Sequence, residues 1–388
     1  MMTRALLVGL TGFLAVLPVP QAPAGGAPAA CSIVTRDNSD DCVRLNQIQL
    51  LGTHNSYHIA PPPPILEMLG ERAREVEYTH RPLVEQLSDL DIRKLELDVF
   101  ADPEGGRFAT PAALRMVQGL DPVAAELRQR GFKVLHTPDV DYRTTCATLK
   151  ACLATIREWS RSHRGHVPIM VMIEVKDTPL EDPKRLGFVQ PVPIGAAELE
   201  ALDAEIRSVF DAGHVITPDR VRGAHKTLAD AIRDSGWPTL RAARGKILFA
   251  LDNTDAHRDA YLRGHPSLEG RMLFVSSAPP EPSAAFIKMN EAAGEDEERI
   301  RAQVRSGFVI RTRADIPTVE ARSGSTVRRD AAFRSGAQYV STDYPEPSPF
   351  GSGYVARLPG TGRRAARCNP VNAPRGCRDE WLEALTGR

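Results

Sequence analysis

A regular alternation of short apolar segments with longer amphipathic ones constrains the fold of this chain most. The apolar segments are rich in Val, Ile and Leu, as expected of parallel strands that are buried on both faces. Helical segments separate most of them, among them one expected over about residues 121–130, which predicts successive βα units. The eight expected strands occupy residues 45–51, 92–99, 133–136, 168–175, 246–251, 272–276, 307–312 and 337–342.

Eight such units over roughly 300 residues predict an α/β fold, a single (β/α)8 barrel of the TIM type with room for distortion. We expect this barrel to span residues 31–345. From residue 346 onward the composition changes to Pro, Gly and Arg. Residues 346–388 are therefore expected to form a C-terminal arm over the barrel and not a second domain.

The N-terminus resembles a secretory signal peptide. Arg4 precedes an apolar run over residues 5–19, and Ala27-Pro28-Ala29 follows as a small-residue cleavage pattern. We expect residues 1–29 to be removed by cleavage near Ala29, giving a secreted protein. The apolar run is too short for a good membrane span, and no later segment is apolar enough, so we expect no transmembrane segment in the mature chain.

The spacing of the cysteines agrees with export to an oxidising compartment. The six cysteines fall as neighbours in the sequence. In an exported protein this predicts three local disulfides, whereas none of the spacings is typical of a zinc site. The expected pairs are Cys31 with Cys42, Cys146 with Cys152, and Cys368 with Cys377.

Charge gives little support to a polyanionic partner. The chain carries 49 Lys and Arg residues against 49 Asp and Glu residues. This balance argues against nucleic acid as a ligand. Hydrophobic residues make up 42% of the chain and charged residues 25%, which is ordinary for a soluble globular protein, and we expect a monomer.

Polar and ionisable side chains collect at the C-terminal ends of the expected strands. TIM barrels carry their chemistry at this end, so the coincidence favours a catalytic centre over a set of unrelated structural residues. The side chains concerned are His54, Asn55, Glu96, Asp98, His136, Glu174, Lys176 and Asp343.

The oxygen-bearing members of this set predict a metal site. Glu96 and Asp98 are two residues apart, so they point to the same face of their strand and repel each other unless a cation compensates. Together with Glu174 and the amide oxygen of Asn55 they form an all-oxygen set, which favours Ca²⁺ or Mg²⁺ over zinc.

The two histidines suit acid–base chemistry. His54 and His136 follow different strands and can act as general base and general acid near neutral pH. A metal between them would stabilise charge on a phosphoryl oxygen. The arrangement therefore suits cleavage of a phosphodiester.

At these residues the chain resembles a known family. Gly52-Thr53-His54-Asn55-Ser56, Leu95-Glu96-Leu97-Asp98, His136 and Glu174 occur in the order found in the phosphatidylinositol-specific phospholipase C superfamily. More narrowly, the chain resembles the secreted, calcium-dependent bacterial branch. The resemblance runs over residues 46–345.

The resemblance implies a mechanism. His54 would be the general base for the inositol 2-hydroxyl, and His136 the general acid for the diacylglycerol leaving group of phosphatidylinositol at a membrane surface. The metal-independent members use an arginine in place of calcium and usually carry Asp where this chain has Asn55. The implied ligands of Ca²⁺ are Asn55, Glu96, Asp98 and Glu174.

The remaining candidates carry weaker signals. Asp343 occupies a position from which it could orient the base histidine or cap a loop. His58 and His80 match no motif, and we expect them to be rim or structural residues. Lys176, Lys288 and Arg311 are candidates for phosphate or inositol contacts, although a cation such as Lys176 often forms a salt bridge at a barrel rim.

Two other functions stay open on the sequence. A glycerophosphodiester phosphodiesterase-like or sphingomyelinase D-like barrel would share the two-histidine logic, but those families usually open with a His-Arg-Gly motif where this chain has His54-Asn55-Ser56. A catalytically inactive phosphoinositide-binding barrel is the second alternative.

Overall fold

The computed structural model describes residues 31–182 and 184–383. Its contacts divide the chain into residues 1–31 and residues 32–388, and the fold described below is that of the second unit. The predicted signal peptide, residues 1–29, lies outside the described residues. None of the helices in the described ranges combines the length and the apolar character needed to cross a lipid bilayer.

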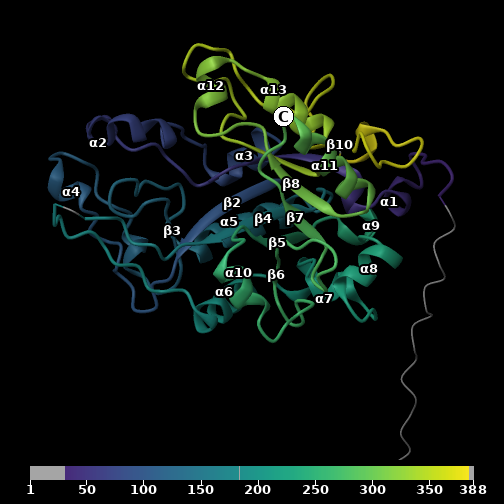
Figure 1. The fold of residues 1–388 in the computed structure, drawn as a ribbon, viewed down its shortest axis with the longest axis horizontal. Coiled ribbons are helices and arrows are strands. Elements are labelled where there is room, and N and C mark those ends of the chain that lie inside the picture. The colour runs from purple at the N-terminus through teal and green to yellow at the C-terminus, as the bar shows by residue number, and fades with distance from the viewer. Residues whose placement is uncertain (1–30, 183, 384–388) are drawn as a thin grey trace, which may run out of the picture. The chain divides into compact units, whose positions relative to one another are not determined.

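A nearly closed barrel of parallel strands forms the centre of this unit (Figure 1). The strands neighbour one another in the order β6-β5-β4-β2-β1-β9-β8-β7, and a parallel bridge between Ser276 and Phe286 joins the two ends of this series. The predicted eight-stranded barrel is confirmed. Its strands are β1 (Ile48–Thr53), β2 (Lys94–Phe100), β4 (Ile169–Val175), β5 (Ile247–Leu251), β6 (Leu273–Phe274), β7 (Phe286–Lys288), β8 (Val309–Arg313) and β9 (Tyr339–Thr342).

Helices and loops connect the strands. In α5 the side chain of the N-cap residue Thr148 accepts a hydrogen bond from Ala151 N, and the helix buries Leu149, Leu153 and Ile156. The helices are α1 (Ser39–Cys42), α2 (Pro63–Leu69), α3 (Leu83–Asp89), α4 (Ala113–Met116), α5 (Leu149–Ser162), α6 (Ala196–Val209), α7 (Pro218–Arg222), α8 (Leu228–Asp234), α9 (Leu240–Ala243), α10 (Ala256–Leu262), α11 (Glu295–Arg305), α12 (Val319–Ser323) and α13 (Val327–Arg334).

The second strand shows how the barrel separates apolar from charged side chains. All seven residues of β2 are buried. Leu95, Leu97 and Val99 belong to the main hydrophobic core. The alternate face of the strand carries Lys94, Glu96 and Asp98, and Glu96 reaches Arg311 on β8 across the barrel. The charged face of β2 therefore points into the barrel, as its alternation predicted.

One predicted strand differs from the structure, and one strand of the structure was not predicted. Residues 133–136 were expected to form a parallel barrel strand, which is wrong. The segment β3 (Lys133–Val134) pairs antiparallel with the end of β2, and β2 pairs directly with β4. The eighth barrel strand is instead β7, which lies at another point of the barrel, between β8 and the end that carries β6. Its three residues are too few to show a period in the sequence.

One predicted helix is also shorter than expected. Residues 121–130 were expected to be helical, but only Ala125–Arg128 forms a helical turn, of the 3₁₀ type. Pro122 and Gly131 bound this segment, and Gly131 has a φ of 110°. Both residues disfavour a longer α-helix.

The C-terminal segment returns to the first strand. The short strand β10 (Ala366–Cys368) pairs antiparallel with Ile48–Leu50 of β1. β1 meets β2 in register only at Gly52, so β10 lies along the half of β1 that precedes this contact. The disulfides Cys146–Cys152 and Cys368–Cys377 confirm two of the predicted pairs. No described cysteine is a free thiol, and the pairing of Cys31 with Cys42 stays a prediction.

Candidate active site

The first histidine is held by a carboxylate from the neighbouring strand. Thr53 of β1 and Thr342 of β9 are register partners, so the residues that follow them, His54 and Asp343, leave the barrel side by side. His54 Nδ1 donates to Asp343 Oδ1 over 2.8 Å. This hydrogen bond fixes the tautomer and leaves the lone pair on Nε2.

A buried arginine completes this pair. Arg313 Nη2 donates to Asp343 Oδ2 over 3.1 Å and lies 3.4 Å from His54 Nδ1. Although burial opposes it, His54 and Arg313 lower the pKa of Asp343 to about 2, so the carboxylate is ionised. Burial, with the charge of Arg313, holds the pKa of His54 below its usual value, so the ring is neutral at neutral pH and can accept a proton.

The loop after β1 is fixed from several sides. Asn55 adopts a φ of 43°, a left-handed conformation that asparagine tolerates better than most residues. Ser56 N donates to Glu96 O over 2.9 Å, which ties the loop to β2. Burial lowers the pKa of His80 to about 4, and its Nε2–H donates to the carbonyl oxygen of His54 over 2.8 Å.

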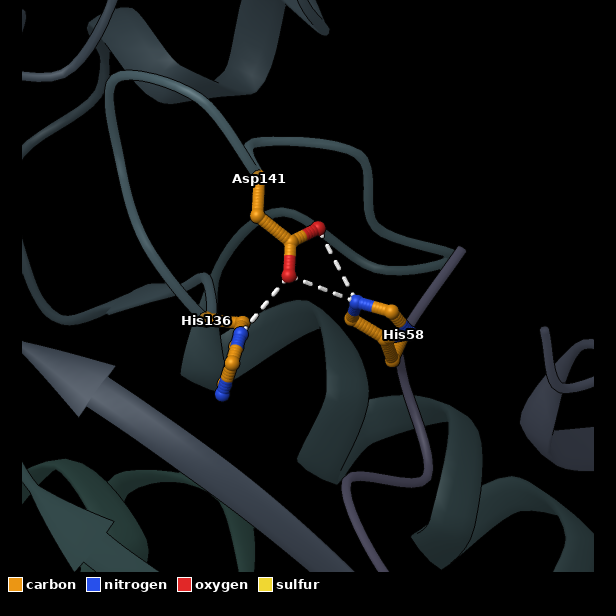
Figure 2. Close-up of side chains that lie close together, drawn as sticks. All are labelled: His58, His136 and Asp141. Atoms are coloured by element: carbon orange, nitrogen blue, oxygen red, sulfur yellow. Dashed lines mark hydrogen bonds and ion pairs between the residues drawn. The ribbon is translucent and has the colours of Figure 1, made fainter. Parts of the chain in front are cut away.

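The second histidine is held by a different carboxylate. His136 Nδ1 donates to Asp141 Oδ2 over 2.7 Å, and His58 Nε2 donates to the same oxygen over 2.8 Å (Figure 2). His58 Nδ1 donates to Tyr78 O over 2.9 Å. Both ring nitrogens of His58 therefore face oxygen acceptors, the carbonyl of Tyr78 and the carboxylate of Asp141.

This arrangement places one nitrogen of His136 at the surface of the site. Burial would raise the pKa of Asp141, but His58 and His136 lower it, so the carboxylate stays ionised. The His136 side chain is 22% exposed, whereas those of His58 and Asp141 are almost fully buried. The Nε2 atom of His136 is thus the one available to a substrate.

Tyr78 lies between the two histidine centres. Its ring centroid is 6.2 Å from that of His54 and 4.4 Å from that of His58. The Tyr78 hydroxyl accepts a hydrogen bond from Asn55 Nδ2 over 3.0 Å. One buried side chain therefore connects both halves of the site.

An acidic group lies beside these histidines. Asp98 on β2 and Glu174 on β4 are register partners. Asp98 is buried and its Oδ2 accepts from Lys176 Nζ over 2.9 Å. Burial, with the nearby charge of Asp98, raises the pKa of Glu174 to about 8. An acidic pair of this kind is stable with its charge reduced by a proton, or with a bound cation.

Glu96 differs from the other predicted ligands because it is already neutralised. Its Oε2 accepts hydrogen bonds from Lys94 Nζ and from Arg311 Nη2. Against the effect of burial, Arg311 and Lys94 hold its pKa well below the usual range. The other oxygen, Oε1, lies 3.5 Å from His54 Nε2. Only Oε1 is left to face a metal or a substrate.

Unsatisfied buried oxygens test whether the site suits a metal. Asn55 Oδ1 and Asp98 Oδ1 are buried and have no hydrogen-bond partner. The Tyr57 hydroxyl lies close enough to Asp98 to have its pKa raised, first by burial and then by that carboxylate, but it makes no hydrogen bond within the usual limits. Buried polar atoms rarely stay unpaired, so these oxygens fit a hard cation such as Ca²⁺.

The three predicted cationic contacts are all engaged by protein groups. Lys176 pairs with Asp98, and Lys288 Nζ pairs with Asp252 Oδ2 over 2.5 Å. Arg311 is almost fully buried and donates to Glu96, and also to Ser341 Oγ over 3.0 Å. Lys176 and Lys288 remain partly exposed, whereas Arg311 serves the interior of the barrel.

Several functional candidates did not stand out in the sequence. His58 and His80, expected to be rim or structural residues, are buried beside the site, and their contacts agree with the structural role. Asp141 follows His136 within a short loop. Arg313 and Asp252 follow or end barrel strands, so the rule that selected Asp98 and Glu174 would have selected them too.

Fold and site together define a class of protein. Parallel barrels carry catalysis at the C-terminal end of their strands. At that end this barrel gathers two imidazoles, each held by its own carboxylate, beside an oxygen-rich acidic group. The protein is a TIM-barrel protein whose strand ends carry groups of the kind used in metal-assisted acid–base catalysis.

Comparison with known proteins gives the family. The model of the family described as phosphoinositide phospholipase C, Ca²⁺-dependent, matches residues 43–370. The chain therefore belongs to the calcium-dependent phosphoinositide phospholipase C family, and it is a phosphodiesterase that uses Ca²⁺. Among the curated proteins, none gave a significant match.

Solved structures show the same fold. A calcium-dependent phosphoinositol-specific phospholipase C from Pseudomonas sp, in apo form, has a TM-score of 0.50 and 16% identity over 82% of this chain and 95% of its own. The myoinositol complex from Pseudomonas sp scores 0.50 with 16% identity over 84% and 96%. A Ca²⁺-dependent phosphatidylinositol-specific phospholipase C from Streptomyces antibioticus scores 0.50 with 19% identity over 87% and 100%.

Proposed function

We propose that the two carboxylate-held histidines divide the acid–base work of phosphatidylinositol cleavage. His54 Nε2 takes the proton of the inositol 2-hydroxyl, whose oxygen then attacks the phosphorus. His136 Nε2 gives a proton to the glycerol oxygen as its bond to phosphorus breaks. The products are a cyclic inositol phosphate and diacylglycerol, and protons balance between the two histidines.

One observation carries this assignment. Each histidine uses Nδ1 to bind a buried carboxylate, His54 to Asp343 and His136 to Asp141, so each offers only Nε2 to a substrate. The pKa of His54 is lowered by burial and by Arg313, which favours the neutral base. The hydrogen bond from His136 Nδ1 to the ionised Asp141 orients Nε2 for donation to the leaving group.

The proposed calcium ligands are those predicted from the sequence. The unsatisfied oxygens of Asn55 and Asp98, the register partner Glu174 and the free Oε1 of Glu96 support this set. When bound, Ca²⁺ would stabilise negative charge on a phosphoryl oxygen. Lys176 and Lys288 are proposed to contact the phosphate or the inositol ring from the rim, while Arg311 would act by holding Glu96.

The setting of the reaction is also proposed. We propose a monomeric enzyme that acts on phospholipid at a membrane surface and has no nucleic-acid partner. Its two described disulfides support secretion after cleavage near Ala29. Mass spectrometry of the N-terminus of protein recovered from culture medium would test the cleavage site.

Turnover of phosphatidylinositol vesicles tests the function. We expect calcium-dependent release of diacylglycerol and cyclic inositol phosphate, followed by ³¹P NMR. His54→Ala and His136→Ala should abolish it, whereas His225→Ala, a histidine paired with Ser235 outside the site, should not. Release of choline from sphingomyelin or lysophosphatidylcholine, without release of diacylglycerol from phosphatidylinositol, would overturn the proposal.

A further inference from the structure

Asp252 extends the acidic group at the barrel mouth by one strand. It directly follows β5, and its backbone N donates to Ile173 O on β4 over 2.8 Å. Ile173 and Leu251 are register partners, so the next residues, Glu174 and Asp252, are neighbours. Since Glu174 also neighbours Asp98, the three carboxylates form one row across β2, β4 and β5, which we term the acidic row.

The local structure holds Asp252 firmly in this row. Asn253 Oδ1 accepts from Val175 N over 2.9 Å, and Asn253 Nδ2 donates to Val175 O over 3.1 Å, so the ends of β4 and β5 are clamped together. Lys288 Nζ donates to Asp252 O over 2.8 Å and to Oδ2 over 2.5 Å. The side chain of Asp252 is therefore fixed before any ligand arrives.

The salt bridge with Lys288 satisfies only one of the two carboxylate oxygens of Asp252. Asp252 is 8% exposed, and its Oδ1 is buried without a hydrogen-bond partner. Leaving such an atom unpaired costs about 1–3 kcal/mol. Asn55 Oδ1 and Asp98 Oδ1, which belong to residues near the same ends of the barrel strands, are in the same condition.

We propose that Asp252 is a further ligand of the calcium ion through Oδ1, while Lys288 holds Oδ2 as its counter-ion. This inference rests on the calcium site of the proposed function and adds a residue to it. Ca²⁺ takes about six to eight oxygen ligands. Glu96 gives at most one oxygen because Lys94 and Arg311 occupy the other, so a further carboxylate from β5 suits the number required.

Calcium titration calorimetry and europium luminescence together test this ligand. Asp252→Asn should weaken Ca²⁺ binding by at least about tenfold, and the luminescence lifetimes of bound Eu³⁺ in H₂O and D₂O should show about one additional water. Asp255→Asn, an exposed carboxylate three residues away, is the matched control and should behave as the wild type. Thermal unfolding in chelator checks that each variant folds.

A charge-balanced variant separates ligation from electrostatics. Asp252→Asn combined with Lys288→Met has the net charge of the wild type, so a purely electrostatic effect of Asp252 would disappear. We expect this double variant to retain the weakened affinity and the additional water. If Asp252→Asn does not fold, Lys288→Met alone should bind Ca²⁺ at least as tightly as the wild type, because a competing cation has gone.

Three results would overturn the inference. If the double variant has the Ca²⁺ affinity and the Eu³⁺ hydration of the wild type, Asp252 acts by its charge alone. If Asp252→Asn binds Ca²⁺ as the wild type does, or if Lys288→Met binds it more weakly, Asp252 is not a ligand. In each case loss of binding in Asp98→Asn would show that the proposed calcium site survives. Absence of Ca²⁺ binding to the wild type would instead overturn that site together with this ligand.

Discussion

Asp141 Oδ2 lies 2.7 Å from His136 Nδ1, and the two residues are only five positions apart in a loop. A short loop thus carries both the proposed acid and the carboxylate that supports its charged form. The same carboxylate binds His58, so its orientation is fixed from the opposite side. This relationship makes the loop testable separately from the first histidine.

Removal of this support should impair protonation of the leaving group. We expect Asp141→Asn to lower kcat on phosphatidylinositol by about 10²-fold, because the neutral amide supports the imidazolium less well. An inositol phosphodiester with an aryl leaving group needs no acid, so the loss should largely vanish with it. Asp343→Asn is the matched variant and should lose activity on both substrates. Equal losses for Asp141→Asn on the two would contradict the role of His136.

Asp343 and His54 should act as one unit. We expect Asp343→Asn to lower kcat by about 10²–10⁴-fold with little change in KM, because the amide no longer fixes the tautomer. In the double variant with His54→Ala the losses should not add, since the carboxylate acts through the ring. Steady-state kinetics of the single and double variants measure this, and additive losses would mean that Asp343 contacts the substrate independently.

The stability of the protein should depend on pH through Asp315. Burial, with the charge of Asp343, raises the pKa of Asp315 to about 7. The unfolded residue ionises near its usual value of about 4, so stability is lost as pH rises from about 4 to about 7 and then levels off. Asp315→Asn lacks this titration, and its advantage over the wild type should grow by up to about 4 kcal/mol across this window.

Chemical denaturation in chelator at pH 4.5 and pH 7.5 checks this prediction. Asp330→Asn, which changes a half-exposed aspartate on α13, serves as the control and should show the pH dependence of the wild type. A constant difference in free energy of unfolding between wild type and Asp315→Asn at both pH values would show that Asp315 is ionised in the fold throughout.

Chelation should separate metal binding from acid–base chemistry. We expect EGTA to abolish turnover and Ca²⁺ to restore it, with Mg²⁺ much less effective because Mg²⁺ demands a smaller, octahedral site. His54→Ala should be inactive but should still bind Ca²⁺ in calorimetry. Turnover that is insensitive to EGTA would contradict the use of calcium.

The two described disulfides should have different effects. Cys368–Cys377 encloses a short loop beside β10, so replacing both residues with Ser should cost about 2–3 kcal/mol of stability, and kcat should stay unchanged below the unfolding temperature. Cys146–Cys152 lies just after Thr144, which bridges His58. Its removal should lower kcat as well, and equal kcat for both double variants would contradict this distinction.

Much of the barrel and of the site could be predicted because both leave a clear pattern in the sequence of a parallel barrel. Buried parallel strands read as apolar runs, and chemistry follows their ends, as His54, Asp98 and Glu174 illustrate. The short strand β7 and the antiparallel pairing of β3 were not predicted, because two or three residues are too few to show a hydrophobic periodicity. Asp141 escaped because its role depends on loop geometry, which brings it between two rings from different segments.

Asp252 and Arg313 could have been predicted as site residues from the sequence. Asp252 directly follows an apolar strand, and Arg313 ends one, so the rule applied to the other strands would have included both. Their partners could not have been predicted, because the pairing of Asp252 with Lys288, or of Arg313 with Asp343, depends on which strands become neighbours.

The pairing of β10 with β1 has a consequence for the order in which the chain can mature. The first half of the first strand finds part of its backbone partners in residues 366–368, which follow all the barrel strands in the sequence. While the polypeptide is being made, that half of the strand lacks these partners until every barrel strand has emerged. The backbone groups in the first half of β1 are therefore paired after those of the other barrel strands. A chain truncated before β10 would keep an unpaired strand edge there.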